Sequence, residues 1–503
     1  MSLPRQLYSA ADVRELDRRA IEQLDISGEE LMERAGRALF RVLRERLPAA
    51  RRVLVLCGAG NNGGDGYVVA RLARAAGLDV VLVATVAPGK PGSVAEHAMQ
   101  VFRNEGGTLQ PFSRVLLNDA DVVIDALLGT GLDRNVEGVL ADIIGAVNES
   151  AIPVMAADIP SGLHADTGRV LGVAVQARYV VSFIGLKAGL FTGQGPAVCG
   201  EVLFDALDLP VSLADGIAPL ATRLEPSDLR AELPARDRDA HKGRFGRVLV
   251  VGGGAGMPGA ARLAGEAALC AGAGRVTTAV WPGNVAAISG QRPELMCRGV
   301  EGGSELDDLS QKADVLAVGP GLGQDGWSET IWDQLSSRQF ASRVLDADAL
   351  NWLTRKPLPL TGNDIITPHP GEAARLLDCT VEDIEADRFA AVRALVTKFG
   401  CVAVLKGAGT LVAGVDAPIR LCDRGNPGMA SAGMGDVLTG LIAGLRAQGL
   451  PALGAACAGV LAHALAGDRA ARAGERGLLA SDLLDELRVV VNPVSLGRTG
   501  TKP

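Results

Sequence analysis

The run Gly433-Met434-Gly435-Asp436 leads directly into an apolar stretch at 437–445, which predicts a helix that begins beside a carboxylate. The free amides and positive end of such a helix start attract phosphate. A carboxylate beside that phosphate is repelled by it, so its presence there indicates a chemical task. The helix dipole supplies only ~0.3–1 kcal/mol, whereas a well-placed general base gives ~10²- to 10⁴-fold in rate. We therefore predict a phosphoryl-transfer site in which Asp436 abstracts a proton. An Asp that merely caps a helix in a glycine-rich turn is the alternative.

Length and composition indicate two or three domains, because 503 residues exceed what one hydrophobic core usually holds. The net charge of −8, the 3% of aromatic residues and the lack of blocks of like charge argue against nucleic acid as a partner. The eight cysteines form no C-x-x-C pair and the five histidines do not cluster, which favours a reducing cytosol and no zinc site. No secretory signal or membrane span is recognisable, so we predict a cytoplasmic protein with no membrane partner.

Short apolar β-rich runs alternate with helical stretches along almost the whole chain, which predicts an α/β protein with parallel sheets covered by helices. The pattern restarts after a stretch at 210–243 that contains Pro226, Pro234 and a dense run of charges and that fits a linker. We place the boundary near residue 220, with domains at 1–219 and 220–503. The expected strands are 52–56, 79–86, 121–128, 153–158, 179–184 and 201–204 in the first domain, and 247–251, 275–280, 315–318, 343–346, 364–367, 402–406 and 410–412 in the second.

The first strand of the first domain ends in a glycine loop, in which Gly58, Gly60 and Gly63 satisfy G-x-G-x-x-G. A dinucleotide-binding site also needs an acid at the end of the next strand, and the run at 80–86 ends without one. The same loop carries Asn61, Asn62 and Asp65, which can hold a cation or hydroxyl groups. Their use merely for left-handed turn geometry is the alternative.

Two later strands of the first domain also end in acids beside glycine loops. Asp125 precedes the loop at 129–135, and Asp158 is followed closely by Ser161. Because the carboxyl ends of parallel strands share one edge of a sheet, Asn62, Asp125, Asp158 and Ser161 are expected to converge on one crevice. Oxygen ligands without sulfur or imidazole favour a hard cation.

These runs resemble the NAD(P)H-hydrate epimerase family over about residues 1–215, and 16–20 and 31–36 resemble its N-terminal helices. The resemblance implies a Rossmann-like three-layer domain in which Asn62, Asp125 and Ser161 hold K⁺. It also implies that Asp158 lines the site for the hydrated nicotinamide, and we predict Asp158 as the acid/base. The remaining substrate-binding residues implied by the resemblance are Asn61, Asn62, Gly63, Gly64, Asp65, Gly129, Thr130, Gly131, Leu132, Asp133, Arg134 and Asn135.

Strand ends of the second domain carry further candidate residues. Gly319 to Gly323 follow one strand, and His369, which is flanked by two prolines that fix its course, follows another. Lys406 starts a run of exposed amides, 406–410, that suits nucleotide phosphates but does not have Walker spacing. A β-hairpin turn is the alternative there, and a structural histidine is the alternative for His369. A second G-x-G-x-x-G match at Gly254, Gly256 and Gly259 again lacks the acid, and either a close approach of backbone to ligand or glycine packing explains it.

Together with 425–436, these loops resemble the ADP- or ATP-dependent NAD(P)H-hydrate dehydratase family over about residues 230–490. The resemblance implies a ribokinase-like domain. It places Ala260, Gly323, His369 and Asp436 at the hydrate. Ala432 occupies a position where the family commonly has glycine. The adenine-nucleotide residues implied by the resemblance are Lys406, Gly407, Ala408, Gly409, Thr410 and Gly435.

The expected function is bifunctional repair of hydrated NADH or NADPH: epimerisation in the first domain, and dehydration of the S form in the second with ADP as phosphoryl donor and Mg²⁺ held mainly by nucleotide phosphates. We also expect a homo-oligomer. One rival is a ribokinase-like small-molecule kinase with an N-terminal nucleotide-binding module. A second rival is a binding protein whose first half only senses nucleotides or partners.

Overall fold

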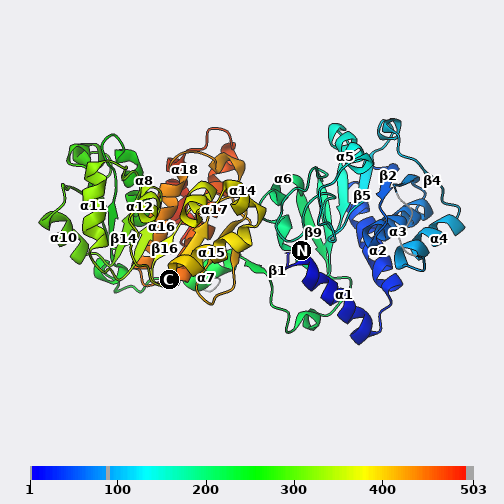
Figure 1. Cartoon of the computed structure of the whole chain (residues 1–503), viewed down its shortest axis with the longest axis horizontal. Coiled ribbons are helices and arrows are strands. Elements are labelled where there is room, and N and C mark those ends of the chain that lie inside the picture. Colours follow the sequence, from blue (N-terminus) through cyan, green and yellow to red (C-terminus); the bar gives the residue numbers. More distant parts are fainter. Residues whose placement is uncertain (1–2, 86–90, 494–503) are drawn as a thin grey trace, which may run out of the picture. The chain divides into compact units, whose positions relative to one another are not determined.

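The computed structural model of the chain describes residues 3–85 and 91–493. Two compact units make up the chain, Met1–Thr222 and Arg223–Pro503. The boundary expected from the sequence, between 219 and 220, lies slightly earlier in the chain. Figure 1 labels many of the elements of both units.

The first unit is built around a parallel sheet whose strands, among the described residues, follow the order β4-β3-β2-β5-β6-β7-β9. Outside this sheet, β1 pairs with β10 in the antiparallel direction and with β8 in the parallel direction, and β10 spans the boundary between the two units. The elements are β1 (Gln6–Tyr8), α1 (Ala10–Leu24), α2 (Gly28–Arg46), β2 (Arg52–Cys57), α3 (Asn61–Ala75), β3 (Asp79–Ala84), α4 (Val94–Asn104), β4 (Leu109–Gln110), β5 (Val122–Ala126), α5 (Val139–Glu149), β6 (Val154–Ala157), β7 (Tyr179–Phe183), β8 (Leu186–Lys187), α6 (Gly195–Val198), β9 (Glu201–Asp205) and β10 (Ala221–Arg223).

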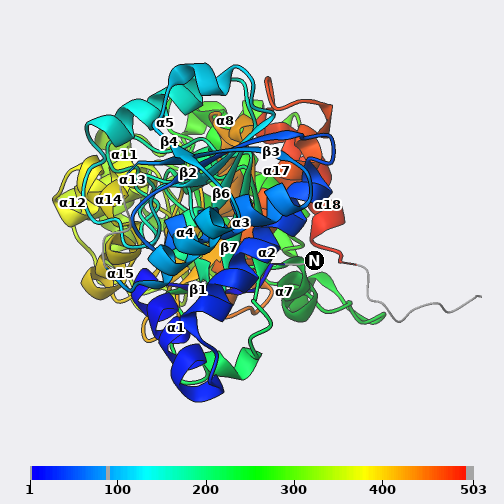
Figure 2. The ribbon, with the colours of Figure 1, turned by 90° about the vertical axis from the view of Figure 1, so that its right-hand side faces the viewer.

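Alternating side chains of β2 point to opposite faces of this sheet, as a β-strand dictates. Val53 and Val55 join the core beneath α2, α3 and α4, whereas Leu54 and Leu56 join the core beneath α5. Figure 2, which faces this unit, shows α2, α3 and α4 as neighbouring helices. The predicted three-layer arrangement is therefore confirmed.

The second unit contains a longer sheet in the order β13-β12-β11-β14-β15-β16-β17-β18-β19 among the described residues. All pairs from β13 to β17 are parallel, whereas β18 and β19 are antiparallel. The elements are α7 (Pro226–Glu232), β11 (Arg247–Val251), α8 (Pro258–Cys270), β12 (Arg275–Val280), α9 (Val285–Ser289), β13 (Met296–Gly299), α10 (Ser304–Gln311), β14 (Val315–Val318), α11 (Gly326–Ser336), β15 (Arg343–Leu345), α12 (Asp348–Arg355), β16 (Ile365–Ile366), α13 (Pro370–Leu377), α14 (Val381–Ala386), α15 (Arg388–Phe399), β17 (Val402–Leu405), β18 (Thr410–Ala413), β19 (Arg420–Cys422), α16 (Met434–Ala447), α17 (Ala452–Ala470) and α18 (Ala480–Val490).

The core of the second unit includes α8, α16, α17 and α18 packed on one side of the sheet through Val248 and Val250 of β11. Leu249 and Val251, which alternate with them, are buried as well, so the sheet is covered on both faces. The alternation of strands and helices in the sequence predicted this arrangement correctly. It did not predict the antiparallel edge, where β17 and β18 form a hairpin.

The stretch expected to be a linker is partly ordered against the second unit. It contains β10 and α7, and Leu229 of α7 is buried in the core of that unit. Arg236 donates a hydrogen bond to the carbonyl of Gly272 at 2.6 Å. Prolines and charges predicted a linker here, whereas leucines between the prolines pack against the core of the second unit.

Both sheets reverse their strand order beside a glycine loop, at β2/β5 and at β11/β14. A Cβ on Gly58 would lie 1.8 Å from the carbonyl oxygen of Leu127, and a Cβ on Gly252 would lie 2.1 Å from that of Pro320. Only glycine permits such an approach of two loops. Ligands of open α/β sheets bind at these reversal points. Of the described helices, none is long and apolar enough to cross a membrane.

Candidate active sites

The helix predicted after the glycine run is α16, and Asp436 is its third residue. Gly433 is the N-cap, with φ of 90°, so Asp436 does not cap the helix. Burial and, after it, the charge of the nearby Asp346 raise the pKa of Asp436 to about 7, and Lys406 opposes both. A carboxyl group with a pKa near neutrality suits a general base.

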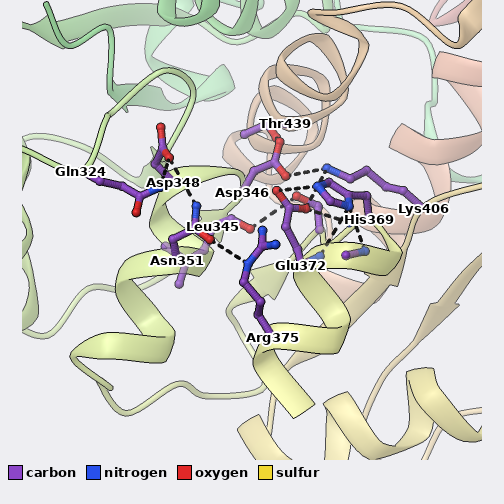
Figure 3. A network of polar contacts seen from close by, with 12 residues as sticks. Gln324, Leu345, Asp346, Asp348, Asn351, His369, Glu372, Arg375, Lys406 and Thr439 are labelled. Carbon is purple, nitrogen blue, oxygen red and sulfur yellow. Dashed lines mark hydrogen bonds and ion pairs between the residues drawn. The ribbon is translucent and has the colours of Figure 1, made fainter. Parts of the chain in front are cut away.

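Lys406, at the end of β17, lies between two acids beside this helix start (Figure 3). Its Nζ is 2.7 Å from Asp346 Oδ1 and 3.7 Å from Glu372 Oε2, and 19% of its side chain is exposed. Burial lowers the pKa of Lys406, but the two acids reverse the effect and raise it overall, so the ammonium group stays charged. A Cβ on Gly435 would be 3.4 Å from Lys406 Nζ, so the predicted nucleotide residues Lys406 and Gly435 are neighbours.

His369 caps α13 with its own ring. Nδ1 accepts hydrogen bonds from the amides of Gly371 at 3.0 Å and Glu372 at 3.4 Å. Because Nδ1 accepts, the neutral ring carries its proton on Nε2, which is 3.4 Å from Glu372 Oε1. Burial lowers the pKa of His369, so the ring is a neutral hydrogen-bond donor, with 52% of its side chain exposed to a ligand.

The predicted hydrate residue Gly323 is tied to the same region through Asp348. Its amide donates to Asp348 Oδ2 at 2.8 Å, and its carbonyl accepts from Trp352 Nε1 at 3.0 Å. Asp348 also raises the pKa of Asp436, so it is electrostatically coupled to the base. Ala260 lies against the same loop, because a Cβ on Gly321 would be 2.9 Å from that of Ala260.

The run 406–410 is the turn of the β17–β18 hairpin, so the hairpin alternative describes its backbone correctly. Gly407 and Ala408 are exposed, and Arg388 donates to the carbonyl of Lys406 at 3.0 Å. The turn is thus a hairpin in which two of the five predicted nucleotide residues of the run, Gly407 and Ala408, are exposed and Gly409 is buried. Ala432 is exposed and is not among the left-handed residues, so its methyl group causes no backbone strain.

In the first unit, the three predicted cation ligands are linked: Ser161 contacts Asp125, and Ser161 and Asn62 both contact the carbonyl oxygen of Leu128. Ser161 Oγ donates to Asp125 Oδ1 at 2.6 Å and lies 3.2 Å from the carbonyl oxygen of Leu128. Asn62 Nδ2 donates to that same carbonyl at 3.0 Å. Among the described residues, the buried Asn62 Oδ1 has no hydrogen-bond partner. Burial raises the pKa of Asp125 to about 6.

Asp158 follows β6 and faces a lysine that the sequence analysis did not select. Its Oδ1 accepts from Lys187 Nζ, from the amide of Phe183 at 3.1 Å and from Ser182 Oγ at 3.4 Å. These donors contact Oδ1 and not Oδ2. The residue has φ of 65°, a conformation that non-glycine residues rarely adopt and that clusters at functional sites.

Lys187 is fully buried, and two more acids surround its pair with Asp158. Burial raises the pKa of Asp65 well above its usual range, and Asp158 and Asp17 raise it further. Burial likewise raises the pKa of Asp17, on α1, to about 6. Four ionisable groups from α1, α3, β8 and the end of β6 therefore influence one another.

The other predicted residues of the first site are distributed along two segments. Gly63, Gly64 and Asp65 lie in the first turns of α3, and Asn61, its first residue, is exposed. A Cβ on Gly129 would be 3.2 Å from that of Asn62, so the start of the second loop adjoins the cation ligands. The rest of that loop is mostly exposed; it comprises Thr130, Gly131, Leu132, Asp133, Arg134 and Asn135.

Sequence reasoning missed Lys187, Asp346, Asp348 and Asp17. Asp346 follows strand β15 as Asp158 follows β6, so the strand-end signal that selected Asp158 was present for Asp346 too. Lys187 lies in an apolar run and gave no such signal. Asp17 was quoted only as part of a helix.

Comparisons with known proteins identify the family of both halves of the chain. A family model described as NAD(P)H-hydrate dehydratase matches residues 248–488, and one described as YjeF-related protein N-terminus matches residues 28–189. The chain is 45% identical over 488 residues to the bifunctional NAD(P)H-hydrate repair enzyme Nnr of Coxiella burnetii (strain RSA 493 / Nine Mile phase I), a match that covers 97% of this chain and 99% of that protein. It is 44% identical to the protein of the same description from Escherichia coli (strain K12), covering 98% of this chain and 95% of that protein.

Among solved structures, a ribokinase-like superfamily protein from Enterococcus faecalis V583 matches with a TM-score of 0.50 and 28% identity, covering 54% of this chain and 95% of that chain. The predicted fold, with a ribokinase-like second domain, is thereby confirmed. Both halves of the chain match, and the match to the curated relatives runs almost from end to end. The chain therefore belongs to the family of bifunctional NAD(P)H-hydrate repair enzymes.

Proposed function

We propose that the chain restores hydrated NADH and NADPH in two steps, one in each unit. The first unit interconverts the R and S epimers. The second unit dehydrates the S epimer with ADP as phosphoryl donor and releases AMP and phosphate. The observation that carries the proposal is the carboxyl group of Asp436 at the start of α16, with a pKa of about 7 and a lysine ammonium group beside the same helix turn.

In the second unit, the difficulty is that hydroxide is a poor leaving group at neutral pH. Asp436 takes the proton of the C6 hydroxyl while that oxygen attacks the terminal phosphoryl group of ADP, and AMP leaves. The free amides of the first turn of α16 and the ammonium group of Lys406 stabilise the charge that develops on the phosphoryl oxygens. Loss of phosphate from C6 and of a proton from C5 then restores the ring double bond.

Mg²⁺ is the expected counter-ion of ADP, and when bound it neutralises charge on the phosphoryl group. Asp346 and Glu372, the acids at Lys406, are already occupied by the ammonium group. The nucleotide phosphates and water are therefore its main ligands in this proposal. Such a site needs no protein cage.

In the first unit, Asp158 is the proposed acid/base for reversible opening of the ring at C6. Its carboxylate takes the hydroxyl proton as the C6–N1 bond breaks, and the proton returns when the ring closes on either face. The contacts of Lys187 and the Phe183 amide with Oδ1 support this role, because they fix the carboxylate and leave Oδ2 for the substrate.

We also propose K⁺ for the first unit. The fit rests on the buried Asn62 Oδ1, which has no hydrogen-bond partner among the described residues, and on oxygens of Asp125, Ser161 and Leu128 close by. One carboxylate with several neutral oxygens suits a monovalent hard cation. When bound, K⁺ would hold the start of the loop at Gly129 against α3.

The test is recovery of reduced-nicotinamide absorbance from an epimer mixture with ADP, with ATP and with neither. Recovery is expected with ADP, and Asp436→Asn abolishes it while epimer exchange, followed by NMR, continues. Loss of both activities in this variant would contradict the assignment of one activity to each unit. A stable phosphorylated product without recovered NADH would indicate a small-molecule kinase instead.

Asp158→Asn is the matching test for the first unit. Epimer exchange is expected to stop while dehydration of the S form continues, whereas unchanged exchange would favour a unit that only senses nucleotides. The preference for ADP over ATP, self-association and a cytoplasmic location remain predictions from the sequence.

A further inference from the structure

Asp346 is a buried carboxylate with both oxygens engaged. It follows β15, its amide donates to the carbonyl of Val318 at 3.1 Å, and only 1% of its surface is exposed. Oδ1 lies 2.7 Å from Lys406 Nζ, and Oδ2 accepts from Thr439 Oγ1 at 2.8 Å (Figure 3). One side chain thus joins three segments that are far apart in sequence.

The two partners of Asp346 frame the first turn of α16. A Cβ on Gly435, the residue before Asp436, would be 3.4 Å from Asp346 Oδ2 and 3.4 Å from Lys406 Nζ. Thr439 is fully buried and lies three residues after Asp436, which places the two residues on the same side of the helix. The rotation and depth of this turn therefore depend on Asp346.

We propose that Asp346 is a positioning residue of the dehydration site, which fixes the first turn of α16 through Thr439 and holds Lys406 beside it, so that Asp436 is kept in place next to a paired negative charge. The proposal rests on the function proposed above for Asp436. It assigns Asp346 no contact with substrate. Its effect passes entirely through Asp436, Lys406 and Thr439.

The charges that face Asp436 support this role. Its pKa is raised to about 7 by burial, then by Asp346 and to a lesser extent by Asp348 of α12, whereas Lys406 lowers it. Asp346 thus provides the largest of the neighbouring charge effects.

The remaining ionisable groups of this region act on Lys406 or on the helix start. Glu372 of α13 helps to hold Lys406 charged, and it lies beside the neutral His369. His463 of α17 bonds to the backbone of Met434, and burial lowers its pKa to about 4, so its ring is uncharged near neutral pH.

The first experiment compares full-length wild type with Asp346→Asn in the pH dependence of kcat/KM for NADH recovery with ADP. Removal of the neighbouring negative charge lowers the pKa of Asp436, so the acidic limb is expected to move to lower pH by about one unit or more. The rate on the plateau is expected to fall by about 10- to 100-fold, because Asp436 is no longer held in place. An unmoved acidic limb would overturn the proposal.

Asp364→Asn is the matched control for a merely structural effect. Asp364 is also a fully buried acid beside a strand of the second unit, and it pairs with Arg343 at 2.8 Å. Its loss is expected to lower the melting temperature without moving the acidic limb. An equal shift of the limb in Asp364→Asn would count against a specific role for Asp346.

A second pair of variants keeps the proposal testable if Asp346→Asn does not fold. Thr439→Val retains the ion pair but removes the bond to Oδ2, and kcat is expected to fall about 10-fold with little change in the KM for ADP. Thr439→Ser, which keeps the hydroxyl group, is expected to retain most of the wild-type kcat. Equal activity of Thr439→Val and wild type would refute the positioning role.

Failure of the proposed function and failure of the positioning role give different results. If wild type recovers no NADH from the hydrate with ADP or ATP, the proposed function itself fails. If wild type is active, but Asp346→Asn does not move the acidic limb and Thr439→Val does not lower kcat, only the positioning role fails.

Discussion

Each unit places a lysine beside an aspartate that follows a strand of a parallel sheet, but the two units connect the pair differently. In the first unit, Lys187 contacts Asp158, the proposed acid/base itself. In the second unit, Lys406 forms its ion pair with Asp346, which is not the proposed base. The charges of this pair act on the proposed base, Asp436. The same residue types therefore produce two electrostatic settings.

The difference shows that the contacts of a base determine how its carboxylate is stabilised and held. A lysine in direct contact stabilises the carboxylate and fixes one of its oxygens, which suits a group that exchanges a proton with substrate in both directions. In the second unit, burial and then the charge of Asp346 raise the pKa of Asp436 to about 7, and Lys406, which contacts Asp346, opposes them only in part. A base with such a pKa is most effective at neutral pH.

The largest effect is expected from Lys187→Met. Loss of one fixed donor to a reacting group costs ~10²- to 10³-fold in rate, and loss of one member of a buried ion pair costs about 3–5 kcal/mol. Epimer exchange measured by NMR and the unfolding free energy of the first unit should both fall. Dehydration of purified S epimer is the internal control and should not change, and a variant with normal exchange would show that direct contact with Asp158 is dispensable.

Lys406→Met should lower activity less than Lys187→Met does. The direction in which it moves the acidic limb of the pH profile is the informative result. Removal of the positive charge raises the pKa of Asp436, so the acidic limb of dehydration should move to higher pH by about one unit, which by itself lowers kcat/KM at pH 7 up to about tenfold. The plateau rate should fall as well, because the phosphoryl oxygens lose one stabilising cation. The limb moves in the opposite direction to that expected for Asp346→Asn. Lys398→Met, a lysine that donates to the carbonyl of Leu376, is the matched control. A limb that moves the same way in Lys406→Met and Asp346→Asn would contradict the charge arrangement described here.

The pH dependence of dehydration by the wild-type enzyme should reveal the titration of Asp436. Asp436 must be a carboxylate to take a proton, and with a pKa of about 7 it is mostly protonated in more acidic solution. The kcat/KM of dehydration should therefore fall about tenfold per pH unit below that value. Steady-state rates across the neutral range, with saturating ADP, test this. A flat profile down to about pH 5, well below that pKa, would exclude Asp436 as the base.

The smallest effect concerns K⁺, for which the second unit has no proposed counterpart. A ligand present at one hundred times its dissociation constant stabilises the folded state by about 2.7 kcal/mol. The melting temperature of the first unit should therefore rise by roughly 5–10 °C in KCl relative to a salt of a large organic cation. Ser161→Ala should reduce the shift, whereas an identical shift in this variant would speak against the site.

The sequence predicted those parts of the sites that depend on local pattern. Strand ends followed by glycine loops located Asp125, Asp158 and Lys406, and a glycine run before an apolar stretch located the start of α16. Most expected strands match within a few residues, although residue 86 of one of them lies outside the described residues.

What the sequence did not predict is side-chain pairing across the sheet. Lys406 and Asp346 are 60 residues apart, and Asp346 and Thr439 are 93 apart. Periodicity and spacing in the sequence do not indicate which acid pairs with which lysine or hydroxyl group, because the pairing depends on the order of the strands in the sheet. For the same reason Lys406, selected as a phosphate ligand, was not foreseen as the partner of an acid.

The complete burial of Lys187 also protects it from chemical labelling. An acylating reagent in solution cannot reach an ammonium group that has no exposed surface, whereas 19% of the Lys406 side chain is open to it. Progressive acylation should therefore silence dehydration first and leave epimer exchange intact until the protein unfolds. Protection by ADP would then report occupancy of the second unit without any measurement of turnover.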